Sequence, residues 1–119
     1  MVSTVTKQCN GKAFEVVITS GTSIGDSAFY GCSGLTGVTI PDSVTSIGNS
    51  AFEGCRKLTS VSNGNAVISI GDCAFYGCSG LTSINFEGTK AQWNAITKGG
   101  NWNDGVTTDC TITCSDGTI

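Results

Sequence analysis

Histidine is absent from this 119-residue chain, and charged residues are scarce. Without histidine the chain lacks the usual general base, the commonest metal ligand and the usual sensor of mild acid. Charged residues make up 13% of the chain and the net charge is −3, so we expect neither a nucleic-acid-binding surface nor a polybasic membrane patch. No apolar run approaches the roughly 18 to 20 residues that a membrane-spanning helix needs, so membrane insertion is not expected.

Proline is also nearly absent, with one residue against 17 glycines, which suits a chain of short strands and tight turns. The first residues, MVSTVTKQ, contain no basic segment followed by an apolar stretch, so the sequence predicts no signal peptide in this chain. At this length we expect one domain.

What the chain does contain is a 23-residue pattern, repeated three times in succession without insertion or loss. The copies are IGDSAFYGCSGLTGVTIPDSVTS from Ile24, IGNSAFEGCRKLTSVSNGNAVIS from Ile47 and IGDCAFYGCSGLTSINFEGTKAQ from Ile70. A fixed period of this length predicts a β-rich solenoid whose coils stack and share one core. The core columns expected from the repeat are Phe29, Phe52 and Phe75; Cys32, Cys55 and Cys78; and Leu35, Leu58 and Leu81.

Each copy divides into a strand, a return segment and a turn. LTGVTI and its equivalents predict short strands that pair in parallel from copy to copy, and VTSIG predicts a second short strand on the opposite side. DSAFYGC predicts a single helical or 3₁₀ turn capped by Asp26. Gly31, Gly54 and Gly77 would supply a positive φ where each turn ends.

The flanking segments predict caps for the two ends of the solenoid, so the chain divides into an N-terminal cap (1–23), three repeats (24–92) and a C-terminal cap (93–119). The Asn10-Gly11 pair predicts a β-hairpin, whose second strand would cover the first coil with Phe14, Val16 and Ile18. At the other end, Thr89 to Gln92 predicts a capping box for a short helix that stops at Gly99. Trp93 and Ile96 would share one side of this helix, and Cys110, Ile112 and Cys114 would alternate inward on a final strand.

Seven cysteines are interpreted as mostly reduced. Cys32, Cys55 and Cys78 occupy one column with parallel side chains, which does not give the dihedral of a disulfide and predicts a buried thiol ladder. Cys110 and Cys114 would lie roughly 13 Å apart on an extended strand, too far for a disulfide. Cys9 and Cys73 have no counterpart column. Zinc is disfavoured because too few ligands and no histidine are present, and no base exists to form a catalytic thiolate.

Asp26, Asn49 and Asp72 form a polar column that could in principle hold calcium. Calcium needs six to eight oxygen ligands, so capping of the turns is favoured. We therefore expect no catalytic residue, no metal and no cofactor.

The pattern IGxxAFxGCxxLTxVTIPxSVTS, over residues 24 to about 89, resembles the BspA-like (treponemal-type) leucine-rich repeats. The segments FEGTKAQWNAITKGGNWND and TITCSDGTI resemble the closing segment of many bacterial members. The resemblance implies a right-handed leucine-rich-repeat superhelix with a parallel sheet along its concave face. It also implies a cell-surface or secreted protein, because members are commonly found there, and an adhesin role, because some members act as adhesins. Asn63 stands where the family has an apolar residue, so we expect a local bend or a hydrogen-bonded asparagine there.

Two surfaces are candidates for binding. The concave face would present Thr39, Ser62 and Asn85, which are small and polar. Three strands of about five residues give only about 220 Å², against roughly 800 Å² for each partner in a standard interface. Tyr30 and Tyr76, on the opposite side with Glu53 between them, are better anchors.

We therefore expect a non-enzymatic, adhesin-like interaction module with an unidentified protein partner and weak self-association. Two alternatives stay open. One is a structural or self-associating spacer, and the other is a carbohydrate binder that uses Trp93 or Trp102. The favoured interpretation of the tryptophans is a hydrophobic lid.

Overall fold

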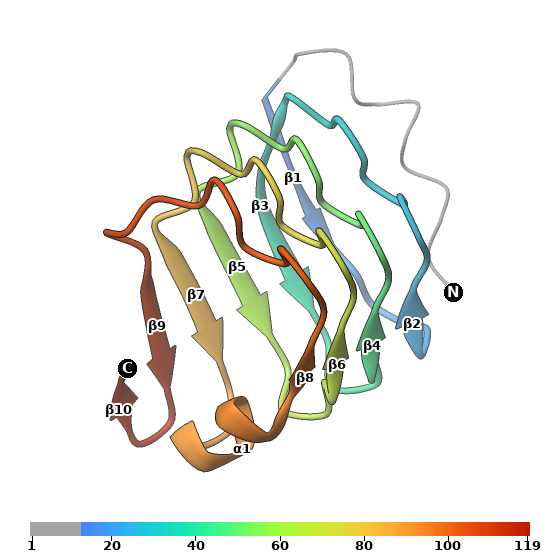
Figure 1. The fold of residues 1–119 in the computed structure, drawn as a ribbon. Helices are drawn as coiled ribbons and strands as arrows, with labels where there is room; N and C mark the ends of the chain where they lie inside the picture. The colour runs from blue at the N-terminus through green and yellow to red at the C-terminus, as the bar shows by residue number, and fades with distance from the viewer. Residues whose placement is uncertain (1–12) are drawn as a thin grey trace.

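A computed structural model describes residues 13–119 as a β-solenoid whose coils lie one on another (Figure 1). The first eight strands alternate along the chain between a six-stranded sheet and a four-stranded sheet of two-residue strands on the other side, and the last two strands complete the six-stranded sheet as an antiparallel pair. The first sheet, in spatial order, comprises β1 (Phe14–Val17), β3 (Leu35–Ile40), β5 (Ser60–Asn63), β7 (Ser83–Phe86), β9 (Thr111–Cys114) and β10 (Gly117–Thr118). The second comprises β2 (Ser23–Ile24), β4 (Ser46–Ile47), β6 (Ser69–Ile70) and β8 (Thr97–Lys98).

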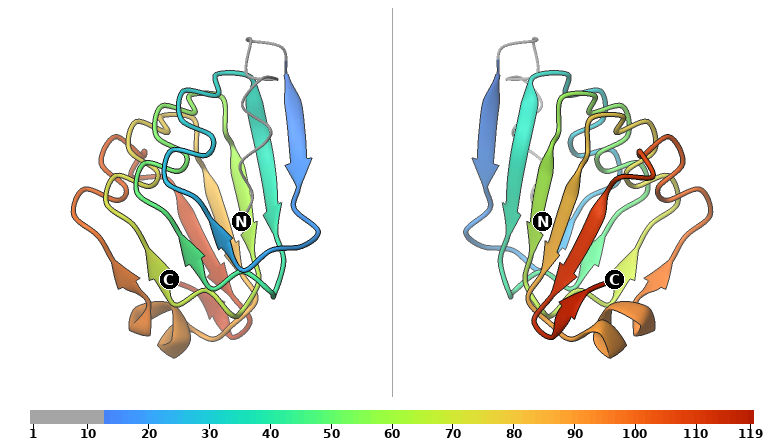
Figure 2. Two further views of the ribbon diagram at one scale, coloured as in Figure 1. Left: turned by 90° about the vertical axis from the view of Figure 1, so that its right-hand side faces the viewer. Right: turned by 90° about the vertical axis from the view of Figure 1, so that its left-hand side faces the viewer.

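The two sheets approach each other at the end where helix α1 (Lys90–Ala95) lies, and turns span the wider end between them (Figure 2). Within residues 13–119, no helix is long and apolar enough to cross a bilayer.

Successive coils pair in parallel and in register. Val38 pairs with Val61, Val61 with Ile84, and Ile84 with Ile112. Because side chains alternate across a strand, this register sends equivalent residues of every coil into the same interior. The predicted stacking is confirmed, as are the strand at LTGVTI and the short return strands.

A column of phenylalanines forms the centre of the core. Phe29 stacks on Phe52, and Phe52 on Phe75, with ring centroids 5.1 Å apart and interplanar angles of 3° and 6°. This spacing is close to the roughly 4.8 Å between paired strands, so the backbone pairing brings the rings into stacking contact. The predicted cysteine and leucine columns are buried beside them. At the N-terminal end, Ile18 is buried and Phe14 and Val16 pack against the core, whereas the hairpin predicted at Asn10-Gly11 lies outside the described residues.

The C-terminal segment continues the solenoid for a further, degenerate coil. β8 pairs with β6, and β9 pairs with β7. Paired residues are 23 apart between Ser46 and Ser69 but 28 apart between Ser69 and Thr97. The extra residues lie in the connection that carries α1. Asn101 adopts the same left-handed conformation as Cys73 one coil earlier, with φ of 56° in both.

Helix α1 begins with the predicted capping box, in which the Thr89 hydroxyl accepts from the Gln92 N–H and Gln92 Oε1 accepts from the Thr89 N–H. The predicted stop at Gly99 is wrong, because the helix ends at Ala95 and the chain enters β8 directly afterwards. Gly99 instead lies against the backbone of Asp72 in the coil before it, leaving no room for a Cβ.

Asn63 does not behave as expected. It is buried in β5, and its Oδ1 has no hydrogen-bond partner in the described part of the chain. The strand also pairs without a register shift, from Ile40 through Asn63 to Phe86, so there is no bend. Pairing on both sides holds the amide in an apolar column.

Replacing Asn63 with leucine, which has a similar shape, is expected to raise the free energy of unfolding by about 1–3 kcal/mol, because an unpaired buried polar atom is removed. Urea denaturation measures the change. Asn63→Asp is the control, and it should destabilise because it would bury a charge. A lower urea midpoint for Asn63→Leu than for the wild type would contradict the interpretation.

Candidate functional site

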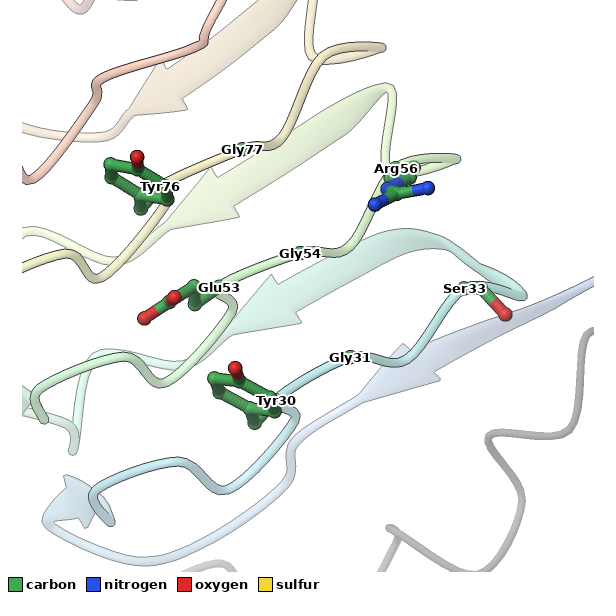
Figure 3. Close-up of a pocket in the computed structure, with 8 residues that line it drawn as sticks. All are labelled: Tyr30, Gly31, Ser33, Glu53, Gly54, Arg56, Tyr76 and Gly77. Atoms are coloured by element: carbon green, nitrogen blue, oxygen red, sulfur yellow. The ribbon is translucent and has the colours of Figure 1, made fainter.

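The turns between the two sheets present a column of outward side chains, here called the turn column: Tyr30, Glu53, Tyr76 and Asp104. The first three occupy equivalent places in successive turns (Figure 3). Backbone hydrogen bonds join their coils. Gly31 N donates to Glu53 O at 2.7 Å, Gly54 N to Tyr76 O at 2.7 Å, and Gly77 N to Asp104 O at 2.8 Å. The sequence did not indicate Asp104, because the insertion at α1 breaks the period, although an Asp-Gly pair replaces the Tyr-Gly pair of the preceding coil.

Two left-handed residues in each turn fix the direction of the column. Gly31, Gly54 and Gly77 have φ of 68°, 77° and 75°, which confirms the predicted positive φ. Four residues earlier in their respective turns, Ser27, Ser50 and Cys73 have φ of 57°, 56° and 56°. This second conformation could not be predicted, because left-handed backbone is uncommon for residues other than glycine. The backbone N–H groups of these residues remain hydrogen-bonded in this conformation. Ser27 N donates to Asn49 O, and Ser50 N donates to Asp72 O, in each case in the next coil.

Both tyrosines of the turn column are open to solvent, with exposed fractions of 58% for Tyr30 and 43% for Tyr76. With Glu53 they line a surface hollow of about 380 Å³. Arg56 and Ser33 line the same hollow from its far end, whereas the rings and the carboxylate lie in one row (Figure 3).

The surroundings of the turn column are acidic. Desolvation, followed by the charges of Glu53, Asp72 and Asp104, raises the pKa of the Cys73 thiol above its ordinary value. Three carboxylates therefore lie close enough to act on one atom. A negative potential at this surface favours a cationic ligand and disfavours an anionic one.

Asp26, Asn49 and Asp72 join neighbouring coils instead of capping their own turns, which corrects the expectation. Asp26 Oδ1 accepts from Asn49 N, Asn49 Oδ1 from Asp72 N, and Asp72 Oδ1 from Gly100 N, each at 2.8 Å. One oxygen of each side chain is thus engaged by the backbone. Among residues 13–119, no group of three potential ligands is placed to hold a metal ion.

The outer face of the six-stranded sheet carries the second predicted set. Thr39 aligns with Ser62, and Ser62 with Asn85, on β3, β5 and β7. Five parallel strands, not three, make this face, which enlarges it to about 370 Å² from the same strand dimensions. It remains well below the roughly 800 Å² of a standard interface. None of the three residues lines the hollow at the turn column, so the structure does not bring the two predicted sets into one site.

Comparison with known proteins agrees with this geometry. The model of the BspA type leucine rich repeat region, in 6 copies, matches residues 5–98. The chain belongs to this family. Leucine-rich repeat proteins generally mediate protein interactions and are generally not enzymes. No curated protein matches the chain significantly.

Among solved structures, a leucine-rich repeat protein from Bacteroides capillosus is similar, with 29% identity and a TM-score of 0.65 over 85% of this chain and 76% of that one. A leucine-rich repeat protein of T. pallidum has 20% identity and a TM-score of 0.40, over 76% of this chain and 71% of that one. A leucine rich cell surface protein from Faecalibacterium prausnitzii has 26% identity and a TM-score of 0.38, over 72% of this chain and 35% of that one.

The tryptophans of this BspA-type solenoid form a lid over its C-terminal end. Trp93 is 4% exposed, and its ring lies 5.6 Å from that of Phe86 and 6.0 Å from that of Trp102. Lys98 Nζ lies 4.8 Å from the Trp93 ring centroid and donates to the carbonyls of Trp93 and Ile96. Partial burial lowers the pKa of Lys98. Trp93 therefore has no free face for a sugar ring, whereas Trp102 is half-buried beside a second hollow of about 230 Å³.

In the described part of the chain, the cysteine column of the BspA-type repeats forms a thiol ladder in two coils. Cys55 Sγ donates to Phe29 O and Cys78 Sγ to Phe52 O, both at 3.1 Å. Cys32 is disulfide-bonded, so the prediction of a free thiol there is wrong. Cys73, Cys110 and Cys114 are free thiols, and the last two do not form a disulfide, as predicted.

Burial raises the pKa of Cys55 and Cys78 to about 12. Both should therefore resist iodoacetamide at pH 8 in the folded protein and react once guanidinium unfolds it, because only the thiolate is nucleophilic. Burial favours the protonated thiols, so their pKa is higher in the folded than in the unfolded state. The stability that depends on keeping these thiols protonated is therefore fully present below the unfolded pKa of about 9 and is lost as the pH rises toward 12. Peptide mass spectrometry follows each thiol, with the more accessible Cys73 as the internal control. Equal labelling of Cys55 and Cys73 in the folded protein would contradict the prediction.

Proposed function

We propose that this BspA-type solenoid is a non-enzymatic module that binds a protein partner through the turn column. The observation that carries the proposal is the pair of exposed tyrosine rings, Tyr30 and Tyr76, beside a hollow of about 380 Å³. Tyrosine is enriched at binding hot spots, because it offers a large amphipathic surface. Here the backbone that carries both rings is already fixed by hydrogen bonds between coils, so little conformational entropy would be lost on binding.

We further propose an adhesin-like role at the cell surface or in secreted form. The disulfide at Cys32 supports this placement, because such bonds persist mainly in oxidising environments. The remaining described cysteines are half-buried or buried, which limits unwanted oxidation of their thiols.

Binding to immobilised collagen, laminin and fibronectin tests the proposal. The wild type should be retained above background on at least one of these proteins, and the double variant Tyr30→Ala/Tyr76→Ala should lose most of that retention. A matched control on the sheet face, Thr39→Ala/Asn85→Ala, should bind like the wild type. Absence of wild-type binding, or equal loss in both double variants, would overturn the proposal.

The two alternatives make different predictions. A self-associating spacer requires oligomers that grow with protein concentration in sedimentation velocity. A carbohydrate site at the tryptophans requires an accessible ring, and the burial of Trp93 leaves only Trp102 for that role.

A further inference from the structure

We propose that the turn column binds the ammonium groups of lysine side chains on an extended segment of the partner. This inference rests on the proposed function and specifies the chemistry recognised at the same site.

The order of side chains in the column supports it. From one coil to the next, the outward residue alternates between aromatic and acidic: Tyr30, Glu53, Tyr76 and Asp104. The phenylalanines that precede the first three in the chain repeat every 5.1 Å. Two coils therefore separate the tyrosines by about 10 Å, at the usual spacing of paired strands.

That separation suits one small cation. An ammonium group midway between the tyrosines would lie about 5 Å from each ring, within the roughly 6 Å over which cation–π attraction is significant. Glu53 occupies the coil between the two rings and supplies the opposite charge (Figure 3). A second lysine would find one ring, that of Tyr76, and one carboxylate, that of Asp104, at the next coils of the column.

The carboxylates of the column are also available. In residues 13–119, those of Glu53 and Asp104 take part in no hydrogen bond or ion pair, whereas Asp26 and Asp72 each commit an oxygen to a backbone N–H. The basic residue that lines the hollow, Arg56, lies at the end away from the rings (Figure 3). A free carboxylate between exposed aromatic rings disfavours phosphate and acidic peptides and favours a cation.

Titration of ¹⁵N-labelled protein with the capped peptide Gly-Lys-Gly-Lys-Gly tests the inference by NMR. Amide shifts should concentrate at Gly54, Gly77 and the column residues, and the affinity should fall at least about fivefold when both lysines are acetylated, because acetylation removes the charge. Higher salt should weaken binding, since the site is exposed to solvent.

Matched variants separate the contribution of the carboxylate charge to peptide binding from that of the aromatic rings. Glu53→Gln and Tyr76→Leu should each weaken binding of the lysine peptide by about fivefold or more, corresponding to the loss of one charge or one cation–π contact. Tyr76→Phe keeps the ring and should therefore retain more of the binding than Tyr76→Leu does. Arg56→Ala, which removes the repelling cation from the hollow, should bind as tightly or more tightly. Unchanged thermal midpoints verify that these exposed substitutions leave the fold intact.

The outcomes distinguish this inference from the proposed function. Equal binding of the lysine and acetyl-lysine peptides, or no binding of either, overturns lysine recognition. The proposed function stands in that case if protein capture still depends on Tyr30 and Tyr76. Loss of capture in the tyrosine double variant together with fivefold discrimination against acetyl-lysine supports both.

Discussion

Phe52→Ala is expected to lower the free energy of unfolding by about 3–5 kcal/mol, the usual cost of truncating a buried phenylalanine. Its ring is fully buried and stacks on Phe29 and Phe75 from both sides. Removal would leave a cavity in the middle of the column, where parallel strand pairing on either side prevents the neighbouring coils from collapsing into it.

Urea denaturation followed by circular dichroism measures this loss. Phe52→Leu should retain part of the stability because it keeps most of the apolar volume. Tyr30→Ala, at an exposed aromatic position of a similar turn, should change the stability by less than about 0.5 kcal/mol. A Phe52→Ala protein as stable as Tyr30→Ala would show that the stacked column contributes little.

Gly48→Ala is expected to destabilise the fold by about 3 kcal/mol or more, at or above the upper end of the usual cost of overpacking. A Cβ at Gly48 would lie 2.6 Å from Asp26 Oδ1, 2.7 Å from Asp26 N and 2.8 Å from the carbonyl carbon of Gly25, closer than real Cβ atoms approach other heavy atoms. Two of these atoms belong to backbone, so the clash can be relieved only by separating the coils. Separation would also lengthen the bond from Asn49 N to Asp26 Oδ1.

Gly100→Ala provides the matched control. A Cβ there would meet nothing within 4 Å, and Gly100 does not have a positive φ. Its substitution should therefore leave stability within about 0.5 kcal/mol of the wild type. Equal effects of the two alanine substitutions, measured by thermal and urea unfolding, would contradict the close-contact argument.

The regular part of the fold could be predicted because one period determines it. Ile24, Ile47 and Ile70 mark equal intervals, and equal intervals force parallel, in-register strands. Irregular features escaped prediction for local reasons. The insertion before Thr97 breaks the period of the last coil, and the left-handed Ser27 is stabilised by a bond to the next coil that its own sequence does not reveal. Asn63 remains buried because pairing with both neighbouring strands holds it in place, although its polar side chain would be better solvated in water.

The candidate site was predictable only in part. Tyr30, Glu53 and Tyr76 share one place in the repeat, so their outward alignment could be expected from the period alone. The fourth member, Asp104, lies in the last coil, which could not be recognised from the sequence because it departs from the 23-residue period. Thr39, Ser62 and Asn85 align with one another as well, but the geometry of the coil places them on strands and the tyrosines on turns.

The uniform register between coils makes the molecule extensible. Duplication of one 23-residue unit would insert another coil without altering the contacts of the coils already present, because each coil contacts only its immediate neighbours. Each added unit would contribute one more outward group at a constant interval. A gene that gained or lost such units would encode proteins with more or fewer binding groups. Their avidity would then change with chain length, without any change in an individual contact.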